Sequence, residues 1–125
     1  MTPEEIVDEF IARLVRLDVD AACELVTDDV EYDNVPMGPV RGPDGIKGVF
    51  AQLSGIVGAM EWVIHRQVAA GNVVINERTD RFCRDGKWAD LPVAGIFEVR
   101  DGKIALWRDY FDMNTMTTRI TELLG

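Results

Sequence analysis

Residues 60–113, MEWVIHRQVAAGNVVINERTDRFCRDGKWADLPVAGIFEVRDGKIALWRDYFDM, carry the strongest indication of the fold, because they contain four strand-like segments divided by three tight-turn signals. The segments are rich in β-branched and aromatic residues, and each turn signal pairs a glycine with asparagine or aspartate, which favours a β-hairpin. The turn pairs are Gly71-Asn72, Asp85-Gly86 and Asp101-Gly102. We therefore expect an antiparallel meander with strands over about 60–70, 73–84, 88–100 and 103–113.

The first half of the chain has a helical pattern instead. Thr2, Pro3 and Glu5 form a capping-box signal, and apolar residues recur at helical spacing from Ile6 to Leu17. Further along, Asp20 can cap a short helix. The remaining expected elements are helices over about 21–26, 44–56 and 114–124, and a strand over about 30–36, with a turn-rich loop between that strand and the 44–56 helix.

Helices followed by an antiparallel meander predict an α+β fold. We expect the N-terminal helices to pack in a strongly curved, mixed or antiparallel sheet that forms a conical cavity. The chain has 125 residues, of which 47% are hydrophobic, and this favours a single domain over residues 1–125 with a substantial core.

The charge balance narrows the classes of partner. The formal net charge is −9, which repels phosphate backbones and anionic lipid surfaces, so we expect no nucleic-acid partner. No apolar run is long enough for a membrane span, and the acidic N-terminus does not resemble a secretory signal, so we expect a cytoplasmic protein.

Metal and cofactor signatures are missing from the sequence. Cys23 and Cys83 are isolated and are expected to be two buried thiols, and the single histidine, His65, is expected to be exposed or structural. There is no CxxC, HExxH, GxSxG or Gly-rich phosphate loop. We therefore expect neither a metal site nor a cofactor.

Strand alternation singles out polar residues that share a face with apolar ones. In the last strand Asp109 shares its face with Trp107 and Phe111. In the 73–84 strand Arg78 and Asp80 point the same way, although that strand alone does not settle which face is inward. In the early strand Tyr32 and Asn34 share a face with Val30 and Pro36. If these faces line one cavity, it holds an arginine between two carboxylates.

Such a constellation suits acid/base chemistry. Burial and like-charge repulsion raise the pKa of one carboxylate while the arginine keeps the other ionised, which supplies an acid and a base in one pocket. The alternative is an internal Asp–Arg–Asp ion network that only ties the strands together. The alternation pattern by itself does not separate these two interpretations.

Three motifs resemble the limonene-1,2-epoxide hydrolase family: Tyr-Asp-Asn-Val-Pro at 32–36, Glu-Arg-Thr-Asp at 77–80 and Trp-Arg-Asp-Tyr-Phe-Asp at 107–112. The resemblance extends over almost the whole chain and implies a nuclear-transport-factor-like, or cystatin-like, α+β fold. It implies Asp109 as the general base, Asp80 as the general acid and Arg78 as the bridge between them. Tyr32 and Asn34 would hold the attacking water.

The resemblance also implies an apolar epoxide (terpene, sterol or fatty-acyl) as substrate, water as nucleophile, no covalent intermediate and a homodimer. Ile104, Leu106 and Tyr110, expected to face outward, are compatible with pairing through the outer sheet face. Candidate substrate-binding residues, which plain core packing would also explain, are Val35, Met37, Leu53, Ile56, Val93, Ile96, Trp107, Phe111 and Met116. The alternatives are a ketosteroid-isomerase-like or polyketide-cyclase-like enzyme and a non-catalytic small-molecule-binding module.

Overall fold

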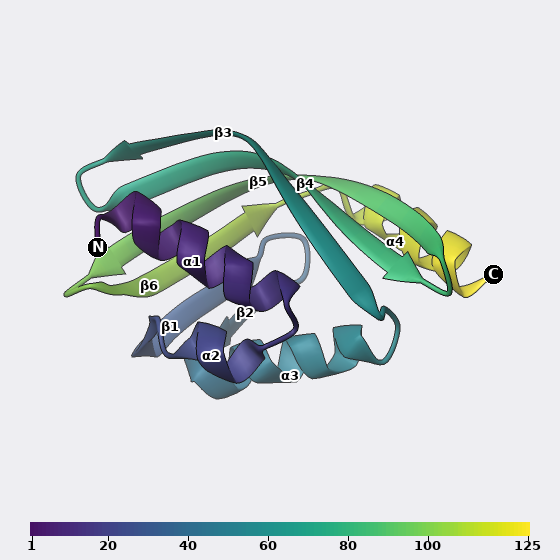
Figure 1. The fold of residues 1–125 in the computed structure, drawn as a ribbon, viewed down its shortest axis with the longest axis horizontal. Coiled ribbons are helices and arrows are strands. Elements are labelled where there is room, and N and C mark those ends of the chain that lie inside the picture. Colours follow the sequence, from purple (N-terminus) through teal and green to yellow (C-terminus); the bar gives the residue numbers. More distant parts are fainter.

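A computed structural model describes residues 1–125. Four helices and six strands follow one another along the chain (Figure 1). Their order is α1 (Pro3–Val15), α2 (Val19–Cys23), β1 (Val26–Asn34), β2 (Gly38–Arg41), α3 (Gly42–Ser54), β3 (Ala59–Ala70), β4 (Val73–Arg84), β5 (Lys87–Arg100), β6 (Lys103–Tyr110) and α4 (Met113–Leu124). None of the helices is both long enough and apolar enough to cross a membrane.

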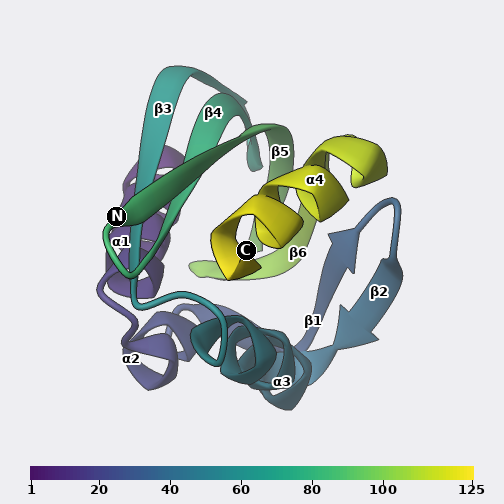
Figure 2. The ribbon, with the colours of Figure 1, turned by 90° about the vertical axis from the view of Figure 1, so that its right-hand side faces the viewer.

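All the strands join one mixed sheet in the order β2-β1-β6-β5-β4-β3. Neighbouring strands are antiparallel except β1 and β6, which run parallel. The long strands arch over α1, and α3 lies under the other end of the sheet (Figure 1). Figure 2 shows the strands curling so that α4 lies across from α3. The predicted α+β class is therefore confirmed.

The turn chemistry accounts for the meander. Asp85 and Gly86 both have positive φ, 51° and 78°, and Asp101 and Gly102 repeat these values. Two successive positive φ angles match the right-handed twist of a two-residue hairpin, which aspartate and glycine tolerate best. The predicted hairpins β3–β4, β4–β5 and β5–β6 are all present.

Helix boundaries follow the capping side chains. Thr2 and Glu5 form the predicted capping box at the start of α1. The second helix differs from its prediction: Asp18, not Asp20, accepts from the Ala21 amide, so α2 spans Val19–Cys23 rather than 21–26. Similarly, the Asp112 carboxylate accepts from the Thr115 amide and begins α4. The last strand therefore stops at Tyr110 instead of 113.

Part of the sheet was not predicted from the sequence. β1 begins at Val26, before the predicted position 30, and β2 lies in the stretch expected to be a loop. The β1–β2 hairpin turns at Met37, whose amide donates to the Asn34 carbonyl, and at Gly38, with φ of 99°. Pro39 is tolerated in β2 because β2 is an edge strand.

One residue predicted to face outward, Ile104, faces inward because of a β-bulge in β6. The pairing of β5 with β6 shifts between Val99↔Ile104 and Glu98↔Leu106, so Ala105 is an extra residue on β6. The bulge turns Ile104 inward, where its side chain is fully buried in the core. Leu106 remains half-buried and Tyr110 is 45% exposed.

The core fills the concave side of the sheet with aromatic rings. Phe10 of α1 meets Trp107 edge-on at 5.1 Å between ring centroids, and Phe97 stacks on the same indole at 6.0 Å. These contacts anchor β6 at the residue two positions before Asp109. Both cysteines are unpaired, as predicted, but they are half-buried rather than buried.

Candidate active site

Arg78 lies at the centre of the site, on β4, with its side chain fully buried. Its Nε donates to Asp80 Oδ1 at 2.9 Å, and its Nη2 donates to Asp80 Oδ2 at 3.0 Å and to Asp109 Oδ2 at 3.0 Å. Its Nη1 donates to Asp109 Oδ1 at 3.3 Å and to Asn76 Oδ1 at 3.0 Å. All five N–H donors of the guanidinium therefore have acceptors. The structure thus settles which face of β4 points inward.

The ring of Trp62 lies 5.0 Å from the Arg78 guanidinium carbon, within cation–π range. Trp62 pairs directly with Asp80 across the β3–β4 ladder, so both side chains point to the concave face. On β5 the neighbour is Gly95. A Cβ built there would lie 2.5 Å from Arg78 Nη1 and 2.9 Å from Asp109 Oδ1. The guanidinium therefore depends on the absence of a side chain at this position.

Asp109, on β6, receives one further hydrogen bond. Trp107 Nε1 donates to Asp109 Oδ1 at 2.9 Å, so the carboxylate accepts from an indole and from the guanidinium of Arg78. Asp109 is 4% exposed, and that exposed part faces a cavity. The sequence predicts Trp107 as a substrate contact. It is instead fully buried beneath the cavity wall, where it orients Asp109.

Tyr32 and Asn34, on β1, lie beside Asp109 because β1 runs parallel to β6. Their register is Tyr32↔Trp107 and Asn34↔Asp109. The Tyr32 ring stacks on Trp107 at 3.9 Å with an interplanar angle of 10°. Burial, reinforced by the Asp109 charge, raises the pKa of the Tyr32 phenol, so it stays a neutral donor. Both side chains line the same cavity as Asp109.

The two carboxyl groups differ in chemistry. Burial raises the pKa of the Asp80 carboxyl to about 6, although Arg78 opposes this rise. Asp80 can therefore retain a proton close to neutral pH and donate it. Arg78 cannot serve as a donor to a ligand because all its N–H groups are used. The site presents a potential acid, Asp80, and a potential base, Asp109, to one space.

That space is a cavity of about 230 Å³ between the concave sheet, α3 and α4. Tyr32, Asn34, Gln52, Asp80 and Asp109 contribute polar groups to its wall, and most of the remaining lining residues are apolar. Six of the predicted substrate-binding residues line it: Met37, Leu53, Ile56, Val93, Phe111 and Met116.

Three predicted lining residues lie elsewhere. Trp107 is below the wall, as described. Ile96 alternates with the inward Gly95 and Phe97, so it points to the outer face of β5. Val35 follows the end of β1 and is 40% exposed at the β1–β2 turn.

Several lining residues were not predicted from the sequence. They are Val49, Phe50, Gln52, Trp62, Phe82, Leu91 and Ile120. The signal for Phe82 was present, because it shares the Arg78–Asp80 face, and Leu91 shares the face of Val93, two residues later on β5. The other α3 and α4 residues of this set, Val49, Phe50, Gln52 and Ile120, were missed because helix orientation against the sheet depends on the packed fold.

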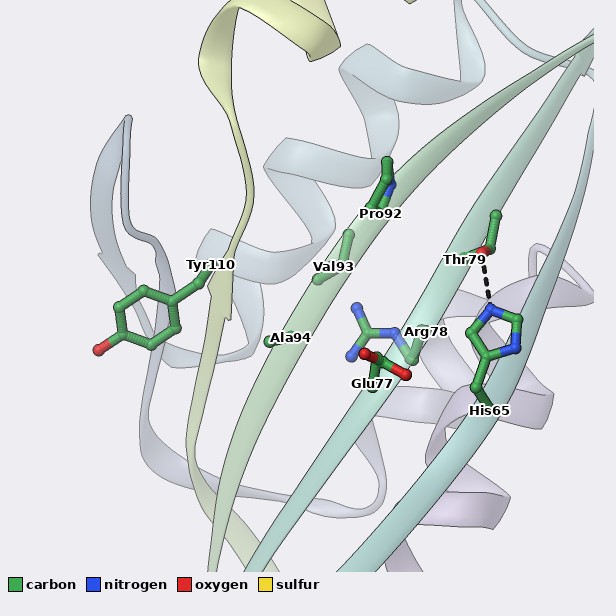
Figure 3. Close-up of a pocket in the computed structure, with 8 residues that line it drawn as sticks. All are labelled: His65, Glu77, Arg78, Thr79, Pro92, Val93, Ala94 and Tyr110. Atoms are coloured by element: carbon green, nitrogen blue, oxygen red, sulfur yellow. Dashed lines mark hydrogen bonds between the residues drawn. The ribbon is translucent and has the colours of Figure 1, made fainter.

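A second, more open hollow of about 500 Å³ lies on the outer face of the sheet (Figure 3). His65 is exposed there, and its Nε2 lies 2.7 Å from Thr79 Oγ1. The hollow contains neither carboxyl group of the Arg78 cluster, so the inner cavity is the candidate active site. No group of three or more His, Cys, Asp or Glu side chains is arranged to hold a metal ion.

Comparison with known proteins agrees with the site. A family model described as the limonene-1,2-epoxide hydrolase catalytic domain matches residues 1–121. Epoxide hydrolase EphG of Mycobacterium tuberculosis is 38% identical over 110 residues, which cover 88% of this chain and 73% of that protein. A solved M. tuberculosis LEH-like epoxide hydrolase superposes with a TM-score of 0.81 at 36% identity, covering 96% of this chain and 90% of that one.

TerC, solved with polyporic acid, superposes with a TM-score of 0.85 over 95% of this chain and 98% of its own, at 22% identity. At that identity the similarity is one of fold alone. The other comparisons show the family. The family model matches nearly the whole chain, and each of the two epoxide hydrolases is more than one-third identical to it. This chain belongs to the limonene-1,2-epoxide hydrolase family.

Proposed function

We propose that this protein converts an apolar epoxide to a vicinal diol by one-step addition of water, with no covalent enzyme intermediate and no cofactor. The observation that carries the proposal is the pair of carboxyl groups, Asp80 and Asp109, held by one arginine and open to one apolar cavity. Family membership supports the same reaction class.

In the proposed mechanism Asp109 takes a proton from a water molecule that Tyr32 and Asn34 hold beside it. The water oxygen forms a bond to one epoxide carbon while the carbon–oxygen bond of the ring breaks. The ring oxygen takes the electron pair of that bond and the proton of Asp80. Asp109 then holds a proton and Asp80 has lost one, and exchange through water restores both. Each positioned group contributes about 10²–10⁴-fold to the rate.

The position of Tyr32 favours hydrolysis over an isomerase-like reaction. An isomerase of this kind uses a tyrosine beside a protonated carboxyl to stabilise an oxyanion. Here Tyr32 and Asn34 lie on the strand next to Asp109, whereas Asp80 is on β4, separated from β6 by β5. The tyrosine and the amide therefore lie beside the proposed base, Asp109, where they can hold a nucleophilic water.

The cavity favours a compact substrate. Its volume of about 230 Å³ lies below the ~300–1,000 Å³ of drug-sized ligand sites. A terpene-sized epoxide fits such a space, whereas a sterol would have to project out of it. We therefore propose a terpene-sized epoxide, or the epoxide-bearing end of a longer chain.

Hydrolysis of a terpene, a sterol and a fatty-acyl epoxide in ¹⁸O-labelled water tests both the direct attack of water and the size of the preferred substrate. We expect diol from the terpene epoxide most rapidly, with the label in the diol during a single turnover, because water attacks directly. An unlabelled first turnover would show that an enzyme carboxylate is the nucleophile. No diol from any epoxide, with folded protein, would overturn the proposed function.

The pH profile tests the role of Asp80. Because the reaction needs Asp80 protonated and its pKa is about 6, we expect kcat/KM to fall as the pH rises through about 6. The pKa of Asp80 in the folded protein lies above the ordinary ~4, so between about pH 4 and pH 6 the folded protein binds this proton more tightly than the unfolded chain does. The contribution of Asp80 to the free energy of unfolding therefore decreases as the pH rises through this range. Rates measured on the terpene epoxide from about pH 5 to 8 give the profile. A flat profile would exclude Asp80 as the acid.

A further inference from the structure

Asn76 is a buried polar residue that the proposed mechanism does not use. It lies on β4, two residues before Arg78 on the same face, and is 2% exposed. Its Oδ1 accepts the one Arg78 N–H that goes to neither carboxylate, at 3.0 Å. If its amide were reversed, two donors would face each other in a buried site with no acceptor between them, which is unfavourable. The orientation of this amide therefore matters to Arg78.

The orientation is fixed from the surface inward. Asn76 Nδ2 donates to Gln67 Oε1 at 3.0 Å, and Gln67 Nε2 donates to Asp8 Oδ1 at 3.0 Å. Asp8 is an exposed residue of α1, and an ionised carboxylate can only accept. Its charge therefore sets the direction of the Gln67 amide, which sets that of Asn76, whose oxygen then faces Arg78.

A β-bulge makes this chain of hydrogen bonds possible. The pairing of β3 with β4 shifts between Ile64↔Arg78 and Arg66↔Glu77, so His65 is an extra residue on β3. Without the shift, residue 66 would follow Trp62 and Ile64 onto the concave face. With it, Arg66 pairs with Glu77 outside, and Gln67 faces Asn76 inside.

We propose that Asp8, Gln67 and Asn76 form a positioning relay that keeps the Arg78 guanidinium in place to bind both Asp80 and Asp109. The relay links α1 to the centre of the sheet through three hydrogen bonds in one direction. None of its members lines the cavity, so it acts on the reaction only through Arg78. Its kinetic consequence rests on the proposed function, but the hydrogen-bond geometry does not.

The first test is Gln67→Leu, which removes both relay bonds of residue 67 while keeping a similar side-chain size. Asn76 Nδ2 then loses its acceptor, so the Asn76 side chain is no longer anchored and Arg78 shifts against both carboxylates. We expect kcat to fall by about tenfold or more with KM unchanged, since small displacements of catalytic groups carry large costs. The matched control is Arg66→Leu, the neighbouring residue on the outer face, which should leave kcat unchanged.

A charge exchange separates positioning from simple packing. In Asp8→Asn/Gln67→Glu, the amide introduced at position 8 can donate to the carboxylate introduced at position 67. That carboxylate still accepts from Asn76, so the Asn76 oxygen continues to face Arg78. Gln67→Glu alone places two carboxylates together and should lower kcat. We expect the double variant to recover most of the wild-type kcat, whereas packing alone predicts no such recovery.

Nuclear magnetic resonance gives a readout that does not need turnover. We expect the Asn76 side-chain amide protons and the Arg78 Nε proton to exchange slowly in the wild type, and to exchange faster in Gln67→Leu but not in Arg66→Leu. Unchanged exchange and unchanged kcat in Gln67→Leu would overturn the relay. If the wild type forms no diol but exchange responds as expected, the proposed function fails while the relay stands.

Discussion

Asp109→Asn is expected to reduce diol formation by about 10²–10⁴-fold, the contribution of one positioned proton acceptor. The substitution keeps the size of the side chain and removes its basicity. It also acts on Asp80: the Asp109 charge helps to raise the pKa of that carboxyl, so its loss leaves Asp80 more firmly ionised beside Arg78. In the proposed mechanism the substitution therefore weakens the base and the acid together.

The stability of this variant must be measured with its activity. Three donors point at Asp109, two from Arg78 and one from Trp107, and an amide nitrogen placed among them would face at least one. Rates should therefore be corrected for the folded fraction. Asp90→Asn is the matched control, because it breaks an Asp–Arg pair of 2.9 Å on the exposed outer face and should change neither rate nor stability appreciably. Undiminished diol formation by folded Asp109→Asn would place the base elsewhere.

Gly95→Ala should disable the site through the addition of a single methyl group. The new Cβ would lie 2.5 Å from Arg78 Nη1 and 2.9 Å from both Asn76 Oδ1 and Asp109 Oδ1. The guanidinium cannot retreat, because its other face is covered by Trp62. We expect about a 10²-fold loss of kcat, with a loss of about 1–3 kcal/mol in the free energy of unfolding from overpacking.

Gly48→Ala is the control for Gly95→Ala. Gly48 is an exposed residue of α3, and a Cβ built there meets nothing within 4 Å. Alanine in a helix interior should raise the stability by about 0.5–1 kcal/mol and leave the rate unchanged. Denaturant unfolding and single-turnover rates on both variants separate the two effects. Full activity in Gly95→Ala would mean that Arg78 need not keep its observed position.

Local sequence rules were enough to predict the meander, the first helix and the polar faces. Aspartate-glycine pairs set two of the three hairpins and Gly71-Asn72 sets the third, a capping box starts α1, and alternation puts Arg78 and Asp80 on one face. The same rules failed where two nearby residues could each play the same role. Asp18 and Asp20 can both cap a helix, and only the packed chain uses Asp18.

Contacts between distant strands determine which of these faces meet. Alternation cannot show that β1 runs parallel to β6, yet that pairing places Tyr32 and Asn34 beside Asp109. Nor can it anticipate bulges, which change the face of the side chains on one side of the extra residue relative to those on the other: one buries Ile104, and another turns Gln67 toward Asn76. The sequence does not distinguish Gly95 from any other strand glycine, because its contact with the Arg78 guanidinium depends on the pairing of β4 with β5. Hairpins, caps and alternation depend on residues that are neighbours in the chain, whereas the site depends on contacts between strands that only the folded sheet brings together.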